Sequence, residues 1–285
     1  MIKIENILVT GCKGQLGHCL KDAVHNRNFI FTDIEELDIT DIDAVTYFVC
    51  KNKIHCIINA AAYTAVDKAE TEPEKAFRIN GYGVLVLTQI CKKLNVLLIH
   101  ISSDYVFDGT ADTPYKINAR RNPISVYGKS KLIGEKEIFF EQIPSIIIRT
   151  SWLYSKYGHN FLNTMLKLGN EKDEIYVVND QFGAPTNAND LAATILHLVD
   201  HVDTITKPTI FHYANEGVTT WYGFAQEIMK IAQLPCKVYP VSTADYPTAA
   251  CRPAYSVLDL SRIKKQYKIL IPNWLESLTH LLIES

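Results

Sequence analysis

The stretch Thr10-Gly11-Cys12-Lys13-Gly14-Gln15-Leu16-Gly17 decides the fold, because it follows a short apolar run and precedes a helical pattern. Its glycines have the spacing GxxGxxG at a predicted turn from strand to helix. Such a turn needs small residues, since the backbone must approach a pyrophosphate closely and the free N–H groups of the helix start bind the anion. We therefore expect a dinucleotide to bind at Gly11, Gly14, Gln15, Leu16 and Gly17.

A carboxylate strengthens this prediction, because glycines alone also end strands for local backbone reasons. Asp33 stands at the end of the second predicted strand, where it would accept hydrogen bonds from the adenosine ribose hydroxyls. The alternative is that Asp33 is only a turn residue. A carboxylate there repels a 2′-phosphate and favours NAD, whereas Lys13 in the glycine loop weakens that preference. We expect NADH or NADPH as the cofactor.

Short apolar runs alternate with amphipathic helical patterns through the first half of the chain, which predicts βαβ units that form a parallel sheet. The predicted fold class is α/β, with a doubly wound parallel (Rossmann) sheet and a second, smaller α/β substrate lobe. The expected strands are 6–9, 29–32, 56–59, 96–101 and 146–149, and the expected helices are 15–24, 42–49, 84–94 and 129–140.

The pattern changes after Arg149, where turn-forming and polar residues become frequent. We expect a dinucleotide-binding domain at 1–150, to which a helix near 186–200 returns, and a mainly substrate-binding domain at 151–285. The last third of the chain is expected to contribute strands 210–213 and 237–240 and helices 221–232 and 274–282 to the smaller lobe.

Tyr127 and Lys131 are four residues apart, which places both on one face of a predicted helix. A phenol with a pKa of about 10 is a poor acid near neutrality, but an ammonium and a positive nicotinamide ring would lower that pKa. The YxxxK pattern alone is often accidental. Ser103 adds a third element, because it follows strand 96–101 at the edge where open α/β sheets bind ligands. We expect Ser103 to bind a substrate carbonyl, Tyr127 to donate the proton and Lys131 to hold the nicotinamide ribose.

Composition excludes several classes of protein. Hydrophobic residues make up 47% of the chain and charged residues 21%, which is typical of a globular protein. A formal net charge of -2 supplies no positive electrostatic field that would attract the phosphates of nucleic acid. No apolar run reaches the ~20 residues that a membrane-spanning helix needs. The chain starts as a core strand, not a signal peptide, so we expect a cytoplasmic protein without nucleic-acid or membrane partners. Seven cysteines without a CxxC pair indicate buried thiols and no metal site.

Together these segments resemble the dTDP-4-dehydrorhamnose reductase family of the extended short-chain dehydrogenases, in which the GxxGxxG spacing also occurs. The sequences AVDKAE at 65–70 and DQFGAPT at 180–186 are more specific than YxxxK, which the whole superfamily shares. The resemblance implies reduction of dTDP-4-dehydro-L-rhamnose to dTDP-L-rhamnose, so that a dTDP-linked 4-ketosugar is the expected partner. It covers nearly the whole chain and is carried by 11–17, 59–70, 103–107, 127–131, 149–152, 180–186 and 252–253.

The resemblance also implies further binding residues. For the cofactor, these are Asp38 and Ile39 beside the adenine and Ala60, Ala61 and Ala62 beside the nicotinamide half.

For the substrate, the resemblance implies that Trp152 offers an apolar ring face to the sugar and Arg252 binds the diphosphate. The alternatives are that Val66 is a core residue, that Trp152 packs between the lobes and that Arg252 forms a surface ion pair. The substrate residues implied are Val66, Asp104, Tyr105, Trp152 and Arg252.

The family usually has threonine where this chain has Ser103. Serine keeps the hydroxyl but lacks the methyl group that restricts its rotamer, so we expect a somewhat looser alignment.

Some members of the family dimerise through a magnesium ion held by glutamates. Cys19, Asn189 and Glu284 occupy the corresponding positions here, so two of the three carboxylates are missing. Because hard cations prefer charged oxygen ligands, we expect no such metal link and either a monomer or a homodimer.

Two alternative functions stay open from the sequence. One is a different nucleotide-sugar 4-ketoreductase with the same fold. The other is a non-catalytic regulatory subunit that resembles the methionine adenosyltransferase accessory protein, because a fold does not determine function. The complete set of Ser103, Tyr127 and Lys131 favours an enzyme.

Overall fold

A parallel six-stranded sheet forms the centre of the computed structural model, which describes residues 4–24, 27–202 and 205–283. Every pair of neighbouring strands in this sheet is parallel, and β1 has its two neighbours on opposite sides. In spatial order the strands are β10 (Pro208–His212), β5 (Ser145–Thr150), β4 (Leu97–Ser103), β3 (Cys56–Asn59), β1 (Asn6–Thr10) and β2 (Asn28–Thr32).

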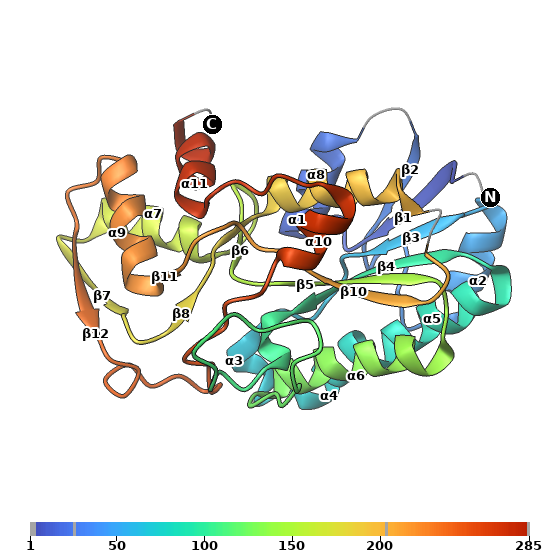
Figure 1. The fold of residues 1–285 in the computed structure, drawn as a ribbon, viewed down its shortest axis with the longest axis horizontal. Coiled ribbons are helices and arrows are strands. Elements are labelled where there is room, and N and C mark those ends of the chain that lie inside the picture. Colours follow the sequence, from blue (N-terminus) through green and yellow to red (C-terminus); the bar gives the residue numbers. More distant parts are fainter. Residues whose placement is uncertain (1–3, 25–26, 203–204, 284–285) are drawn as a thin grey trace.

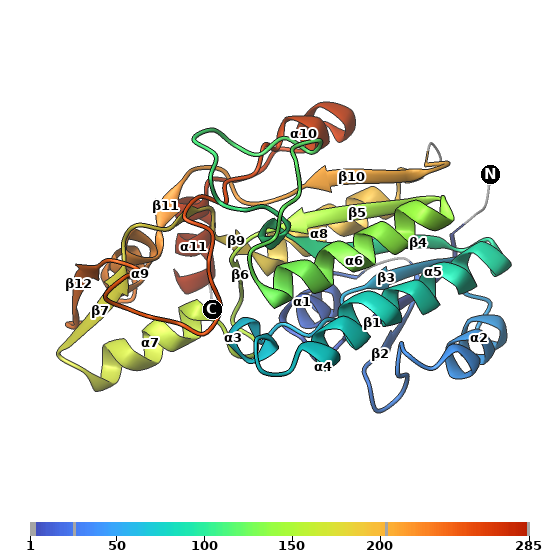
Figure 2. The same ribbon diagram turned by 90° about the horizontal axis from the view of Figure 1, so that it is seen from below.

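Helices cover both faces of the sheet, as Figures 1 and 2 show. Successive residues of a strand point to opposite faces, so Ile7 and Val9 join one apolar cluster and Leu8 joins the other. This arrangement confirms the doubly wound α/β class. One layer contains α1 (Gln15–Ala23), α8 (Ala188–Val199) and α10 (Ser261–Tyr267), and the other contains α2 (Ile42–Lys51), α5 (Gly83–Leu94) and α6 (Val126–Glu141).

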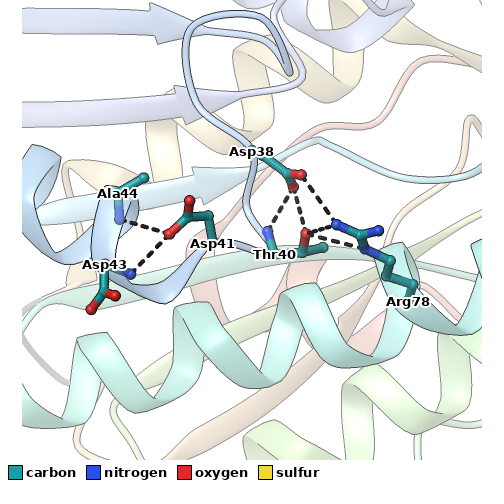
Figure 3. Close-up of polar contacts among 6 residues, drawn as sticks. All are labelled: Asp38, Thr40, Asp41, Asp43, Ala44 and Arg78. Carbon is teal, nitrogen blue, oxygen red and sulfur yellow. Dashed lines mark hydrogen bonds and ion pairs between the residues drawn. The ribbon is translucent and has the colours of Figure 1, made fainter.

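Polar residues determine where two of these helices begin. Asp41 caps α2 by accepting hydrogen bonds from the backbone N–H groups of Asp43 and Ala44, as Figure 3 shows. The Ser125 hydroxyl caps α6 by accepting from Gly128 N. Helix α6 therefore begins three residues earlier than the expected position 129, and Tyr127 lies in its first turn.

A smaller lobe lies beside the carboxyl edge of the sheet (Figure 1). Its strands β7 and β12 pair in parallel, and its core surrounds Phe224, whose ring contacts those of Tyr154, Phe161 and Trp274. The lobe contains β6 (Leu153–Tyr154), α7 (Phe161–Glu171), β7 (Glu174–Val178), β8 (Phe182–Gly183), β9 (Thr186–Asn187), β11 (Thr219–Thr220), α9 (Trp221–Ile231), β12 (Lys237–Val241) and α11 (Trp274–Ile283).

The strand expected at 210–213 in the smaller lobe is instead β10 of the main sheet. Its five residues are all buried, and it extends the sheet by pairing in parallel with β5. Helix α10 also contributes Ile263 and Tyr267 to the core on the face of the sheet that α1 and α8 cover. Part of the 151–285 segment therefore belongs with the dinucleotide-binding sheet, whereas the boundary at residue 150 stays a prediction.

The remaining short elements connect β3 to α5 and follow β4. They are α3 (Val66–Ala69), α4 (Pro73–Phe77), a π-helical turn (Arg78–Tyr82) and a 3-10 turn (Asp104–Val106). Within the ranges that the structure describes, every helix is too short or too polar to cross a lipid bilayer.

We expect Phe224→Ala to lower the free energy of unfolding by about 3–5 kcal/mol, because it removes a fully buried ring from the smaller lobe's core. Urea denaturation followed by circular dichroism measures this loss. The matched control is Phe140→Ala on α6, whose ring is 81% exposed, and a comparable loss in both variants would contradict the prediction.

Candidate active site

A cleft of about 880 Å³ lies where β1, β3, β4 and β5 end, between the sheet and the smaller lobe. All of the residues predicted to form the site line it, although their individual roles stay predictions. They are Gly11, Gly14, Gln15, Leu16, Gly17, Asp33, Asp38, Ile39, Ala60, Ala61, Ala62, Val66, Ser103, Asp104, Tyr105, Tyr127, Lys131, Trp152 and Arg252.

The glycine loop fits closely against the segment that follows β3. Gly11 has a φ of 69°, and a Cβ atom there would lie 2.6 Å from the backbone N of Ala61. A Cβ atom on Gly17 would lie 2.5 Å from the Gly11 carbonyl oxygen. No side chain caps the first turn of α1, and no acidic residue lies in it, so its N–H groups suit a phosphate anion. The loop therefore fits the pyrophosphate of a dinucleotide.

Asp33 links the end of β2 to the glycine loop. Its Oδ2 accepts from Lys13 N at 2.8 Å, and its Oδ1 accepts from Ile34 N at 2.9 Å. The Lys13 ammonium forms an exposed ion pair with Glu35 at 2.8 Å. Each carboxylate oxygen can accept a second hydrogen bond, so Asp33 can also accept hydrogen bonds from ribose hydroxyls.

Asp38 lies in the loop between β2 and α2, and Figure 3 shows its contacts. Its Oδ1 accepts from both the backbone N–H and the hydroxyl of Thr40 at 2.8 Å, and its Oδ2 lies 3.6 Å from the Arg78 guanidinium. The next residue, Ile39, is buried against Gly83, where a Cβ atom would lie 2.8 Å from Ile39 Cδ1. The loop is thus held against the π-helical turn and α5.

The Ser103 hydroxyl has a defined orientation. It donates to Asp104 Oδ1 at 2.9 Å and accepts from Tyr105 N at 3.1 Å. These two bonds restrict the rotamer of the hydroxyl, and the looser alignment expected for serine relative to threonine stays a prediction. Burial raises the pKa of Asp104 to about 7, and hydrogen bonds from Ser256 and Ser103 oppose this rise.

Tyr127 lies in the first turn of α6, with its ring edge-on to that of Tyr105 at 5.7 Å. Burial raises the pKa of its phenol to about 12, and a hydrogen bond with Ser103 partly opposes the rise. The lowered pKa expected from a neighbouring ammonium is therefore not found in the protein alone, because desolvation dominates. The phenol is protonated at neutral pH, which is the form that a proton donor requires.

Lys131 is 2% exposed, and its ammonium donates to the Ile101 carbonyl of β4 at 2.5 Å. Burial lowers its pKa to about 8, and the negative charge of Glu135 opposes that shift. The Tyr127 and Lys131 side chains thus reach one cleft from successive turns of α6, as the YxxxK spacing predicts.

The Trp152 side chain packs closely against Trp221 and Gly183 of the smaller lobe. Its ring stacks on Trp221 with centroids 3.6 Å apart, and Gly183 lies so close to the indole that a Cβ atom there would be 2.5 Å from it. Trp152 has a left-handed φ of 45°, held by the Thr186 N–H that donates to its carbonyl at 3.1 Å. Trp221 therefore covers one face of the Trp152 ring, and the contact of this ring with the sugar stays a prediction.

Arg252 lines the cleft and is also held by an ion pair. Its two terminal nitrogens donate to the Asp67 carboxylate at 3.0 and 2.7 Å, and Asp67 also accepts from Ala250 N at 3.0 Å. This bidentate pair ties the 248–252 loop to α3, and it lowers the pKa of Asp67. The alternative ion pair is thus observed, whereas binding of the diphosphate by Arg252 stays a prediction.

The sequence interpretation missed several residues of the cleft wall. Phe161 begins α7 and Trp221 begins α9, and both line the cleft beside Trp152. Asn160 also lines it and caps α7 by accepting from Asn163 N at 3.0 Å. The capping residues Asn160 and Thr220 indicate in the sequence where α7 and α9 begin. The sequence near these helices does not indicate that their first residues face the cleft.

Cys19, Asn189 and Glu284 occupy the positions where some family members hold magnesium with glutamates, and the structure describes the first two of them. Cys19 is buried, which raises the pKa of its thiol to about 12 and disfavours the thiolate that binds metals. Asn189 lies in the first turn of α8, and Glu284 lies outside the described residues. The oligomeric state stays a prediction.

Comparisons with known proteins agree on one family. The family model described as RmlD substrate binding domain matches residues 5–285. The dTDP-4-dehydrorhamnose reductase of Aggregatibacter actinomycetemcomitans is 40% identical over 290 residues, covering 98% of this chain and 98% of the relative.

Two solved structures are similar over their whole length. The dTDP-4-dehydrorhamnose reductase of Bacillus anthracis in complex with NADP has a TM-score of 0.95 and 36% identity, covering 99% of this chain and 100% of that one. The corresponding protein of Clostridium acetobutylicum has a TM-score of 0.93 and 38% identity, covering 97% and 98%.

We expect kcat/KM for the reduced nicotinamide cofactor to fall above about pH 8, by about tenfold per pH unit at the alkaline end. The reason is that burial lowers the Lys131 pKa to about 8, so raising the pH through that value removes the ammonium that is predicted to bind the ribose. A pH profile of the wild type beside Lys131→Met measures this. A wild-type profile that stays flat to about pH 10 would contradict the assignment.

Proposed function

The chain belongs to the RmlD substrate binding domain family, and from this we propose that it reduces dTDP-4-dehydro-L-rhamnose to dTDP-L-rhamnose with NADH or NADPH. The observation that carries the proposal is the convergence of Ser103, Tyr127 and Lys131 on the cleft that the glycine loop borders. Relatives with the reductase name match almost the entire chain, which supports the same activity here.

The two alternative functions have less support. A different nucleotide-sugar 4-ketoreductase would share the fold, but several relatives that are 36–40% identical to this chain are named dTDP-4-dehydrorhamnose reductase. A non-catalytic subunit has no need of a buried lysine and a protonated tyrosine in a cleft that suits a dinucleotide.

The chemistry follows from the groups in the cleft. NAD(P)H, when bound, supplies the hydride that adds to C4 of the ketosugar. The C4 oxygen gains negative charge as the hydride arrives, and Tyr127 gives it the phenol proton. Lys131 holds the nicotinamide ribose and favours the phenolate that Tyr127 becomes. The products are the C4 alcohol, the oxidised cofactor and a phenolate that takes up a proton from solvent.

Ser103 orients the carbonyl in this proposal. Its one hydroxyl proton is directed to Asp104 Oδ1, so it must be turned toward the substrate when the ketosugar enters. The raised pKa of Asp104, about 7, means that a large fraction of this carboxyl is protonated near neutrality. A protonated Asp104 no longer competes as strongly for the serine proton, which frees Ser103 to donate to the carbonyl oxygen.

The sugar pocket is formed by aromatic and small apolar groups. We propose that the Trp152 indole contacts the sugar while Trp221 fixes its orientation by stacking on one of its faces. Val66 at the start of α3 and Tyr105 after β4 line the same cleft and complete the wall of this pocket.

Arg252 is proposed to bind the dTDP diphosphate. Its guanidinium is already oriented by Asp67, so little side-chain freedom is lost when phosphate oxygens bind to its remaining N–H groups.

The activity itself is tested by loss of absorbance at about 340 nm when the protein meets dTDP-4-dehydrorhamnose and NADH or NADPH. We expect Tyr127→Phe to lower kcat by roughly 100-fold or more, since general acid catalysis typically contributes that much. Cofactor binding, measured by nucleotide fluorescence, should be retained. Unchanged turnover in this variant would exclude Tyr127 as the proton donor.

We expect Arg252→Met to raise KM for the dTDP-sugar roughly tenfold to 100-fold, because a charge-assisted hydrogen bond contributes about 1.5–3 kcal/mol. The value of kcat should change little, since the diphosphate is remote from the reacting carbon. Arg120→Met is the control, because Arg120 is exposed and does not line the cleft. Equal KM values for Arg252→Met and the wild type would remove Arg252 from the substrate site.

A further inference from the structure

A row of buried polar side chains crosses the sheet directly beneath α6. Ser102 on β4 is in register with Arg149 on β5, and Arg149 is in register with His212 on β10. All three are at most 2% exposed. The same face of the sheet also carries apolar residues such as Leu98 and Ile147, in the cluster that α5 and α6 cover, and a buried His100 between Leu98 and Ser102.

The carboxylate of Glu135 joins this row to α6. Its Oε1 accepts from the Ser102 hydroxyl at 2.6 Å and from Arg149 Nε at 2.8 Å, and its Oε2 accepts from Arg149 NH2 at 2.7 Å. Glu135 and Arg149 are both 0% exposed. Arg149 also donates to the Ile117 carbonyl at 3.1 Å, so both buried charges have several partners.

This pair lies next to the groups that the reaction uses. Glu135 follows Lys131 by one helical turn, and the Lys131 ammonium donates to the carbonyl of Ile101, the residue before Ser102. Ser102 in turn precedes Ser103 on β4. One carboxylate therefore connects the helix that carries Tyr127 and Lys131 to the strand that carries Ser103.

A buried ion pair does not by itself explain this placement. Removing two charges from water costs free energy, and apolar residues of similar volume often stabilise a core equally well. The position of the pair beside the catalytic residues therefore needs another reason.

We propose that Glu135 is a positioning residue of the reduction, whose negative charge keeps the buried Lys131 ammonium charged while its hydrogen bonds hold α6 in register with β4. This inference rests on the proposed function, because it assigns Glu135 a part in the same site. Glu135 does not line the cleft, so it acts through Lys131 and Ser102.

The charges around Lys131 are consistent with this role. On its own helix Lys131 is flanked by Glu135 and by the neutral phenol of Tyr127. From β4 it faces His100, whose pKa is lowered well below the usual value by burial and by the Lys131 charge, so that His100 is neutral. Among these described groups, Glu135 supplies the negative charge that opposes the desolvation of the ammonium.

The test is Glu135→Gln in the full chain, with kcat/KM for NADH measured from pH 6 to pH 9. Loss of the Glu135 charge should lower the pKa at which kcat/KM begins to fall by about one pH unit. The ratio of kcat/KM at pH 6 to kcat/KM at pH 8 should therefore rise roughly fivefold over that of the wild type. A ratio is used because a uniform loss of activity from loosened packing leaves it unchanged. Glu137→Gln, two residues along α6, is the matched control and should keep the wild-type ratio.

Because Glu135→Gln leaves the Arg149 guanidinium buried without its counter-ion, a double variant with Arg149→Met is made as well. Either variant, once circular dichroism shows it folded, should show the raised ratio. A folded variant with the wild-type ratio, the same shift in Glu137→Gln, or failure of both Glu135 variants to fold would overturn the proposal. A wild-type protein without turnover would instead refute the proposed function.

Discussion

The close approach of the turn after β1 to the segment after β3 is the constraint on which the cleft depends. Gly11 and Ala61 are so near that no side chain fits between them, and Gly17 is equally close to the Gly11 carbonyl. This contact lies where the strand order reverses, with β2 and β3 on opposite sides of β1. A dinucleotide bound there would face the ends of β4 and β5, which is the edge where Ser103, Tyr127 and Lys131 line the cleft.

Local signals in the sequence predicted most of the nucleotide-binding half. The strand 56–59 was predicted with its observed bounds, and the glycine loop, Asp33 and Ser103 were placed correctly at strand ends, because strand alternation and turn chemistry act over a few residues. The features that were predicted wrongly or not at all depend on contacts between residues far apart in the sequence. The strand at 208–212 was assigned to the smaller lobe because nothing local shows that it pairs with β5. The stacking of Trp152 on Trp221 likewise depends on a residue that is far away in the chain.

Desolvation, and not attraction between the two side chains, sets the protonation of Tyr127 and Lys131 in the protein without ligands. Burial raises the pKa of Tyr127 to about 12 and lowers that of Lys131 to about 8, so both groups are displaced toward their neutral forms. The sequence interpretation considered the attraction between phenolate and ammonium but not the burial of both. For a reduction this arrangement is productive, because the acid begins with its proton and only the lysine depends on nearby negative charge.

The chain passes between the two lobes after β5, before α8, after β10 and on either side of α10. A lobe attached by one linker can rotate as a rigid body, but one attached at several crossings can rotate only if all of them bend together. The walls of the cleft are therefore mechanically coupled, and the 248–252 loop adds a further tie to α3 through the bonds of Arg252 and Ala250 to Asp67. A hinge motion of one lobe against the other is therefore disfavoured, so the residues along the cleft keep their relative positions.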